Sequence, residues 1–352
     1  MQHFDKIRAA LGENDAMLIT SAPNRFYASG FESSAGVAIV TKEENYFFTD
    51  FRYIEAAEKA IDGAKVVGIN QFKGYMASIK DVIKKHDIKK LGFEEESVSY
   101  AAYKSYESEL GVELCPNQMA VTMQRASKTP EEFEIMKQAQ AIAEKSFNQL
   151  LNVINTNMTE RDVATELHYL MMKNGSQDKS FDTIVVSAEK SSMPHGVPGD
   201  VKLKKGFLTI DFGVKYKGYC SDTTRTLCIG APTDEMKKIY NIVLEAQKRG
   251  IETAKAGVIC SDVDKAGRDY IKAAGYGDYF GHGFGHSLGI EIHEYPRAAE
   301  SFDVPLPEGA VISAEPGIYL PGKFGVRIED VLYITKDGNI DITNLTRDMI
   351  IL

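Results

Sequence analysis

Hydrophobic and polar positions alternate in short blocks along the first third of the chain, and longer helical patterns separate these blocks. Strands are predicted at residues 15–20, 35–40, 45–50, 65–69, 89–93 and 112–116, and helices at residues 52–61, 75–86 and 100–110. The second and third strands enclose the polar segment TKEE, which predicts a hairpin. This order of elements predicts a small α/β domain that ends near Pro116.

A long amphipathic helix is predicted to open the second part of the chain. Thr129 suits its N-cap, Pro130 suits its first turn, and Glu132 completes a capping box. Apolar residues then recur every three or four positions, at Met136, Ala143, Phe147, Leu150 and Ile154. We therefore place the domain boundary within residues 118–128, with an N-terminal domain over 1–120 and a C-terminal domain over 121–352.

The order helix, helix, strand, strand appears twice in the C-terminal domain. The first set is predicted at 130–154, 160–174, 206–212 and 219–229, and the second at 234–256, 262–274, 310–317 and 325–335. Because the two sets share few identical residues, the repeat is one of pattern. It predicts two halves that pack around a pseudo-twofold axis with their sheets side by side.

Composition narrows the classes of protein that this chain can represent. It has 352 residues, 43% of them hydrophobic, and a formal net charge of −9. This size predicts two domains, and the acidic balance without a basic block argues against nucleic acid as a partner. No apolar run approaches the roughly 20 residues of a membrane helix, and the charged N-terminal segment does not resemble a signal peptide. Four cysteines without a CxxC pair predict free thiols, so we expect a cytoplasmic enzyme.

Two predicted hairpins each bring a pair of carboxylates together. In residues 207–229, a turn between Tyr216 and Lys217 places Asp211 directly opposite Asp222. In residues 311–334, a turn around Gly322 places Glu315 opposite Glu329, unless a bulge at residue 316 or 317 shifts the pairing. Directly opposed residues on one sheet face have Cβ atoms about 4.5–5.5 Å apart.

Four carboxylates among apolar neighbours require compensating charge. One such hairpin alone is better explained as an acidic, solvent-facing hairpin. Two that are related by the repeat instead predict a shared site, because opposed like charges in apolar surroundings are destabilising. Oxygen ligands with an added imidazole suit manganese, cobalt, iron or zinc in a two-metal site, with ions about 3.5–4 Å apart.

A glycine-rich segment, GHGFGHSLGIEIHE at residues 281–294, supplies the imidazoles. It holds three of the chain's seven histidines, at His282, His286 and His293. A single histidine is more often a hydrogen-bonded structural residue, but the glycines would let the backbone wrap closely around a ligand. The segment is neither an HExxH motif nor a P-loop, and the DFG at residues 211–213 lacks the other kinase motifs.

The order of these motifs resembles the proline peptidases of the pita-bread metallopeptidase family, aminopeptidase P and prolidase. The resemblance rests on IDFG, SDTTRT, HGFGHSLGIEIHE, SAEPGIY and VRIED, and extends to RFYASGF and FFTDFRY near the N-terminus. It implies an α+β protein. A C-terminal pita-bread domain (the creatinase/aminopeptidase fold) with a pseudo-twofold repeat would follow a smaller N-terminal α/β creatinase-like domain.

The same resemblance implies a role for each motif residue. Two divalent metal ions, manganese first and cobalt, zinc or iron as alternatives, would be held by Asp211, Asp222, His286, Glu315 and Glu329. Asp222 and Glu329 would bridge the ions. His195 and His293 would line the substrate cleft, and His282 would lie by the proline pocket. Tyr319 and Arg327 would link Glu315 to solvent, and an ion pair between Arg327 and Glu329 is compatible with that role.

The implied reaction is hydrolysis of the peptide bond before proline in a peptide or dipeptide. A hydroxide that bridges the two metal ions would attack the carbonyl carbon, and Glu315 would pass the water proton to the leaving nitrogen. The resemblance also implies a homodimer. Arg297 lies where some prolidases bind the dipeptide carboxylate, although the following Ala298 replaces the more usual Ile or Leu. Dipeptidase and aminopeptidase P therefore both stay open.

Other functions known for the same fold are less consistent with this sequence. Methionine aminopeptidases normally lack the small N-terminal domain, and creatinase-type hydrolases lack the metal ligands. A non-catalytic peptide-binding module on this fold should have lost one or more of the ligands. All five ligand residue types are present here.

Overall fold

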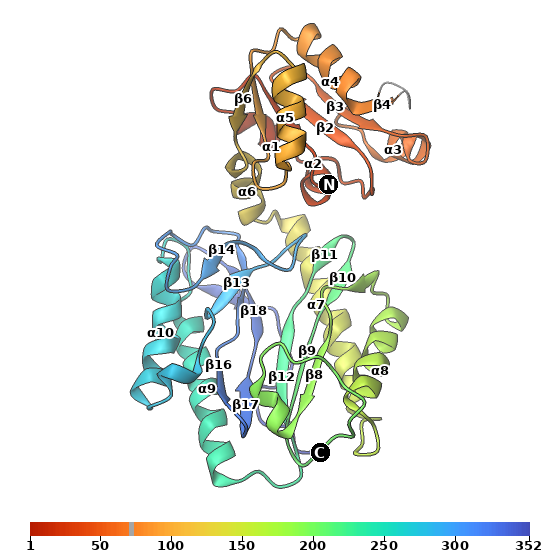
Figure 1. Ribbon diagram of the computed structural model, residues 1–352. Coiled ribbons are helices and arrows are strands. Elements are labelled where there is room, and N and C mark those ends of the chain that lie inside the picture. Colours follow the sequence, from red (N-terminus) through yellow and green to blue (C-terminus); the bar gives the residue numbers. More distant parts are fainter. Residues whose placement is uncertain (70–73) are drawn as a thin grey trace. The chain divides into compact units, whose positions relative to one another are not determined.

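The computed structural model describes residues 1–69 and 74–352, and these form two compact units (Figure 1). The first unit is Met1–Arg125 and the second is Ala126–Leu352. Among the described residues, no helix has the length and apolar character needed to cross a membrane. The two units are described separately below.

A six-stranded mixed sheet forms the centre of the first unit, in the order β4-β3-β2-β1-β5-β6. The strands are β1 (Ala16–Ile19), β2 (Val37–Thr41), β3 (Asn45–Thr49), β4 (Lys65–Gly68), β5 (Lys90–Phe93) and β6 (Glu113–Pro116). β2 and β3 form the predicted antiparallel hairpin, whereas β4, β5 and β6 each run parallel to a neighbour. All six predicted strands are present.

The described residues of this part of the chain form six helices: α1 (Phe4–Ala9), α2 (Ala22–Ser29), α3 (Ile54–Ala60), α4 (Gly74–Lys85), α5 (Tyr100–Glu109) and α6 (Met119–Ala126). The sequence pattern predicted α3, α4 and α5 but not the other three. α1 and α2 span six and eight residues, too few to show a clear helical period. α6 occupies most of the segment in which we placed the domain boundary, residues 118–128.

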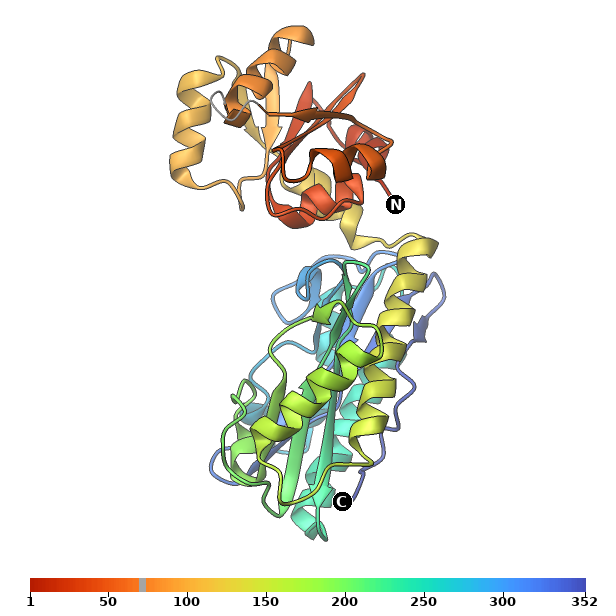
Figure 2. The same cartoon turned by 90° about the vertical axis from the view of Figure 1, so that its right-hand side faces the viewer.

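Two pairs of long helices cover the strands of the second unit. α7 (Pro130–Leu150) contacts α8 (Glu160–Lys173), and α9 (Asp234–Thr253) contacts α10 (Cys260–Ala273). The capping box of Thr129 and Glu132 is present at the start of α7. In Figure 2, α7 (yellow) and α8 (yellow-green) lie over the strands of the first half.

The strands of the first half make two small sheets, β12-β9-β8 and β11-β10-β7. They are β7 (Asp178–Lys179), β8 (Ile184–Ser187), β9 (Gly206–Phe212), β10 (Val214–Tyr216), β11 (Tyr219–Cys220) and β12 (Thr223–Ile229). A short 3₁₀ helix, Ala188–Ser192, follows β8. Phe147 of α7 stacks on Phe212 of β9, with ring centroids 5.2 Å apart, so the helix pair packs onto this sheet.

The second half contributes the sheet β14-β13-β15-β18-β19 and the pair β16-β17. These strands are β13 (Gly285–Ser287), β14 (Glu294–Ala298), β15 (Val311–Ala314), β16 (Gly317–Leu320), β17 (Phe324–Arg327), β18 (Asp330–Ile334) and β19 (Asn339–Asp341). Phe207 of β9 meets Phe324 of β17 edge to face at 5.3 Å. The two halves therefore share a hydrophobic core.

The predicted pairing in the first hairpin is wrong by two residues. Asp211 lies opposite Thr224, not Asp222, and Asp222 immediately precedes β12. The turn is formed by Lys217 and Gly218, which have φ angles of 47° and 81°. Two-residue hairpin turns with positive φ at both central positions match the twist of the strands, and glycine favours the second position. Because the error is two residues, both aspartates still lie on one face of the hairpin.

The predicted pairing in the second hairpin is confirmed. Gly317 pairs with Arg327 in β16-β17, and Ala314 pairs with Asp330 in β15-β18. The same register continues on both sides of a break in each strand. Glu315 and Glu329 lie in that break, and the register on either side of it places them opposite each other.

Candidate metal centre

A cavity of about 540 Å³ in the second unit brings most of the candidate site residues together. Ten of the eleven residues predicted from the motifs line it: His195, Asp211, Asp222, His282, His286, His293, Arg297, Glu315, Arg327 and Glu329. Tyr319, the remaining one, is buried behind the wall, where it contacts His282 and Arg327.

Asp211 lies near the end of β9, whereas Asp222, Glu315 and Glu329 lie at breaks in their strands. The backbone N–H of Glu315 donates to the carbonyl of Phe284 at 2.8 Å, and that of Glu329 donates to the carbonyl of Thr224 at 3.1 Å. The backbone N–H of each glutamate thus bonds outside the glutamate's own hairpin, to the residue before β13 for Glu315 and to β12 for Glu329. We call Asp211, Asp222, Glu315 and Glu329 the carboxylate cluster.

The two halves of the molecule meet at this cluster. The hydroxyl of Thr224, in the first half, donates to Oε2 of Glu329 in the second half at 2.7 Å. Arg327, in the second half, forms an ion pair of 2.6 Å with Asp211 in the first half. The expected ion pair of Arg327 with Glu329 is therefore replaced by one with Asp211.

His286 faces the carboxylate cluster from β13. Its Nε2 lies 3.3 Å from Oε1 of Glu315 and 3.5 Å from Oδ2 of Asp222. Its Nδ1 lies 3.1 Å from the carbonyl oxygen of Ser287, which can only accept a hydrogen bond. Nδ1 therefore carries a proton, which leaves Nε2 as the ring atom available to a metal ion.

Burial makes the negative charge of the cluster costly. It raises the pKa of Asp222 and of Glu329 well above the usual range, and the neighbouring carboxylates raise both further. Burial also raises the pKa of Asp211, although the charge of Arg327 opposes this. For Glu315, burial acts in the same direction, but the hydrogen bond from His286 and nearby positive charge outweigh it and lower its pKa to about 2.

The residues fit a metal centre. Ligand atoms of Asp222, His286 and Glu329 lie within 4.8 Å of one another. Oδ1 of Asp211 is buried and has no hydrogen-bond partner among the described residues. A bound cation would satisfy this oxygen and offset the like charges, as buried carboxylates require.

Two glycines near the site lie where neighbouring backbone segments approach closely. A Cβ atom on Gly285 would lie 2.0 Å from the carbonyl oxygen of Ser313, and one on Gly213 would lie 2.0 Å from that of Ser221. These glycines allow neighbouring backbone segments to approach closely. Gly285 directly precedes His286, and Gly213 packs against Ser221, which directly precedes Asp222, so these close approaches help to set the positions of the proposed ligands.

A hydrogen-bonded chain runs behind the cavity wall. Arg327 Nη1 donates to the Tyr319 hydroxyl at 2.8 Å, and that hydroxyl lies 2.9 Å from Nε2 of His282. Burial raises the pKa of Tyr319 to about 12 and lowers the pKa of His282. The chain therefore links a neutral imidazole to Asp211, and its hydrogen bonds do not run to Glu315 as expected.

His195, His293 and Arg297 lie on the exposed side of the cavity. The ring of His293 meets that of His286 edge to face at 4.4 Å. Burial, followed by the charges of His286 and Arg297, lowers the pKa of His293 to about 4. Arg297 pairs with His286 across β13 and β14, which places its side chain at the cavity wall.

Several lining residues were missed in the sequence. Phe181, Ile184 and Phe302 give the cavity an apolar wall, and Ile184 lies directly opposite Asp211 in the β8-β9 pair. The apolar run IVVS was the available signal for β8, but nothing in it indicated which strand it pairs with.

Thr224 lies within the motif SDTTRT, but its hydrogen bond to Glu329 could not be predicted from the sequence, because it depends on packing between the two halves.

Comparison with known proteins gives matches over almost the whole chain. Residues 134–336 match the model of metallopeptidase family M24, and residues 3–127 match that of the creatinase/prolidase N-terminal domain. The chain is 42% identical to the uncharacterized peptidase YqhT of Bacillus subtilis, over 99% of both chains. It is 37% identical to an Xaa-Pro dipeptidase of Pyrococcus horikoshii, over 96% of this chain and 94% of that protein.

Solved structures give the same result. An Xaa-Pro dipeptidase from Bacillus anthracis superposes with a TM-score of 0.96 at 41% identity, covering 99% of both chains. An X-Pro aminopeptidase from Thermotoga maritima superposes with a TM-score of 0.92 at 36% identity, covering 99% of this chain and 100% of that one.

Proposed function

Because this chain belongs to metallopeptidase family M24, we propose that it hydrolyses the peptide bond before proline in short peptides, using two divalent metal ions. The observation that carries the proposal is the carboxylate cluster, buried beside His286 in one cavity. Relatives named Xaa-Pro dipeptidase, at 36–37% identity over nearly the full length, support the choice of substrate.

The proposed ligands are the five residues implied by the motifs: Asp211, Asp222, His286, Glu315 and Glu329. Asp222 and Glu329 would be shared between the two ions. Oxygen ligands with one imidazole favour manganese, and cobalt, zinc or iron are the alternatives. When bound, the two metal ions would lower the pKa of a water molecule towards neutrality and polarise the scissile carbonyl.

Glu315 is the proposed proton carrier. An ionised carboxylate that binds a metal ion through one oxygen keeps lone pairs with which it can accept a proton from the attacking water. It would then deliver that proton to the leaving proline nitrogen. This nitrogen belongs to a tertiary amide and has no hydrogen of its own, so it must gain a proton to leave as an amine.

The histidines of the cavity are proposed to bind and orient the peptide. His293, whose pKa is about 4, is neutral at physiological pH and can donate a hydrogen bond to the developing oxyanion. His195 would contact the peptide at the opposite wall, and His282 would lie against the proline ring. The apolar side chains of Phe181 and Ile184 would exclude water around the substrate.

Arg297 is the proposed determinant of peptide length. In an Xaa-Pro dipeptide a carboxylate follows directly after the proline ring, and a guanidinium can bind it with two hydrogen bonds. A longer peptide has a neutral amide at that point. Since Arg297 lines the cavity, we favour an Xaa-Pro dipeptidase over an aminopeptidase P.

We also propose that the protein acts as a cytoplasmic homodimer. Residues 1–120 would be its creatinase-like domain and residues 121–352 its catalytic domain, with one subunit's small domain closing over the partner's cleft. Mixing a metal-site variant with an N-terminal-domain variant should then restore partial activity. A fully active protein that sediments as a monomer at assay concentration would rule this out.

A substrate panel tests the proposed reaction. Metal-loaded protein should cleave Ala-Pro much faster than Ala-Ala, and it should not release methionine from Met-Ala peptides. Preferred cleavage of Met-Ala would instead support a methionine aminopeptidase. Tight binding of two metal ions and of Ala-Pro without any cleavage would support a non-catalytic peptide-binding module.

A further inference from the structure

In each half of the second unit, a buried glutamine reaches from the long helix to the residue that follows a proposed shared ligand. Gln140 of α7 donates to the hydroxyl of Thr223 at 2.7 Å, next to Asp222. Gln247 of α9 donates to Oδ2 of Asp330 at 3.1 Å, next to Glu329. Both glutamines are at most 1% exposed, and neither lines the cavity. They therefore hold equivalent places in the repeat.

Each glutamine continues into the backbone beside its ligand. The Thr223 hydroxyl that accepts from Gln140 donates in turn to the carbonyl of Asp222 at 2.6 Å. Gln247 also donates to the carbonyl of Ala314 at 3.0 Å, next to Glu315. The two side chains thus hold residues adjacent to three of the four members of the carboxylate cluster, Asp222, Glu315 and Glu329.

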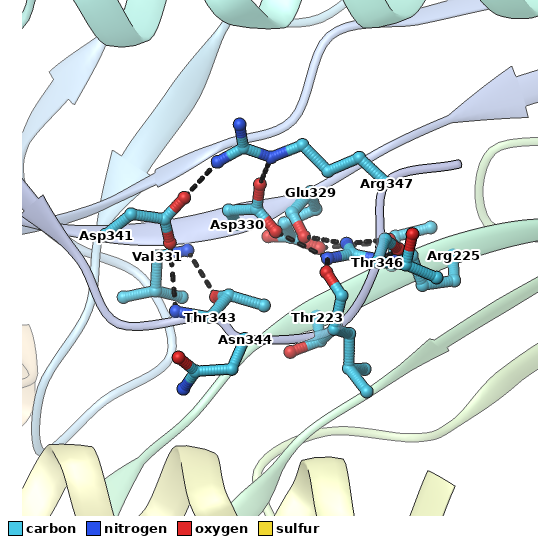
Figure 3. Close-up of polar contacts among 12 residues, drawn as sticks. Thr223, Arg225, Glu329, Asp330, Val331, Asp341, Thr343, Asn344, Thr346 and Arg347 are labelled. Atoms are coloured by element: carbon cyan, nitrogen blue, oxygen red, sulfur yellow. Dashed lines mark hydrogen bonds and ion pairs between the residues drawn. The ribbon is translucent and has the colours of Figure 1, made fainter. Parts of the chain in front are cut away.

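Arg225 connects the two halves behind the same ligands. It is 2% exposed, and its guanidinium donates to the carbonyls of Thr224 and Glu329 and to the carboxylate of Asp330. Two further bonds reach the carbonyls of residues 345 and 346. Every N–H of this side chain is therefore used. Figure 3 shows it against Glu329 and Asp330, with the latter also held by Arg347.

Gln140 and Gln247 are not the side chains that would best stabilise the folded protein at their positions. The amide oxygen of each is buried and has no hydrogen-bond partner among the described residues. An unsatisfied buried acceptor costs free energy, and an apolar side chain of similar shape would avoid that cost. Stability alone therefore does not explain why glutamine occurs at these two positions, whereas a role in holding the neighbouring ligands does.

We propose that Gln140, Gln247 and Arg225 are positioning residues that hold Asp222 and Glu329 at the spacing two metal ions require. This inference rests on the proposed function. Four carboxylates in a small buried volume repel one another, so their backbone must be held by groups outside the cavity. Partners one layer behind metal ligands commonly change metal affinity by about tenfold to a hundredfold.

The test compares Gln247→Met and Gln140→Met with a control from the same region. Methionine has a similar length and suits a helix, but it cannot donate to the strand. The matched control is Tyr240→Phe on α9, which removes a buried hydrogen bond of 2.8 Å to the backbone carbonyl of Arg347 and no hydrogen bond made by Gln140 or Gln247. Cobalt(II) is the probe, followed by calorimetry and by its visible absorption spectrum.

Both methionine variants should bind cobalt at least about tenfold more weakly than wild type, with altered spectra and a folded circular dichroism signal. Tyr240→Phe should lower the melting temperature and leave cobalt affinity unchanged. Wild-type affinity and spectrum in both methionine variants would overturn the inference while leaving the proposed function intact. Failure of wild-type protein to bind cobalt would overturn both.

Discussion

Among single residues, Asp222 shows most clearly why the site needs cations. It is 4% exposed, and Glu329, Asp211 and Glu315 all raise its pKa after burial has done so. The nearby Nε2 of His286, at 3.5 Å, is its ion-pair partner only when the imidazole is protonated. A bound metal ion would stabilise the ionised carboxylate of Asp222, which burial and the neighbouring carboxylates otherwise disfavour.

Replacing Asp222 by Asn should abolish activity and leave the fold intact. The amide preserves the shape of the side chain but removes the negative charge that both metal ions would share. Metal content, measured by elemental analysis after dialysis, should fall sharply, while circular dichroism stays unchanged. Near-wild-type turnover with two bound ions would show that Asp222 is not a ligand.

Arg297→Ala should separate dipeptides from longer peptides. If Arg297 binds the substrate carboxylate, its loss should cost Ala-Pro cleavage about 2–3 kcal/mol in kcat/KM, the scale of a charge-assisted hydrogen bond in a site. Ala-Pro-Ala cleavage should barely change, because its proline carries a neutral amide. A small and equal effect on both substrates would mean that Arg297 faces solvent and that the enzyme is an aminopeptidase P.

The motif residues were visible in the sequence because they stand in short motifs, such as IDFG, SDTTRT and HGFGHSLGIEIHE, that resemble those of a known family. Their partners were not visible. Arg327 pairs with Asp211 across 116 residues, and Thr224 bonds to Glu329 across 105 residues. Only the packing of one half against the other creates these contacts, so no local spacing could predict them.

At the scale of elements, the close approach of neighbouring strands determines where the ligands lie. Gly213 follows β9 and faces the backbone of Ser221, which precedes Asp222. Gly285 does the same against Ser313, two residues before Glu315. At both glycines, backbone atoms occupy the space that a side chain would need. These close approaches lie next to the proposed ligands Asp222, His286 and Glu315.

Gly213→Ala should weaken both the fold and the metal centre. Its Cβ would lie 2.0 Å from the carbonyl oxygen of Ser221, so the backbone must shift, at a cost of about 1–3 kcal/mol. Melting temperature and cobalt affinity should both fall. Gly338→Ala is the control, since nothing lies within 4 Å of that position. Equal behaviour of the two variants would contradict this account of Gly213.

Turn chemistry decided which hairpin could be predicted. The second hairpin turns around Gly322, which has a φ of 71°, and its register was predicted correctly. In the first, we centred the turn one residue too early and so displaced the pairing by two. Lys217 adopts a positive φ without being glycine, which hid the true turn. The short helices α1 and α2 were missed for want of a periodic pattern, and they do not contribute to the site.

At the scale of the whole molecule, the carboxylate cluster couples stability to pH and metal. The folded-state pKa values of Asp222 and Glu329 are raised above their ordinary values. Their protonated forms therefore favour the metal-free folded state, and this contribution is lost as pH rises through the folded pKa values. Metal binding requires the ionised forms, so protons and metal compete for the cluster.

The rise in melting temperature on adding manganese should therefore be larger at pH 8 than at pH 5. At the higher pH the metal-free protein pays the full cost of the ionised cluster, and the metal removes it. Thermal unfolding followed with and without manganese at both values measures this difference. Asp222→Asn should lose most of the effect. An increment that is equal at both pH values, or larger at pH 5, would contradict the coupling.

Cleavage before proline should depend on two metal ions bound by the carboxylate cluster. The most direct measurement is proline release from Ala-Pro by chelator-treated protein to which manganese is added in steps. We predict no release without metal and a plateau at about two equivalents per chain. Full activity in the metal-free protein, or no proline release with two ions bound, would contradict the claim.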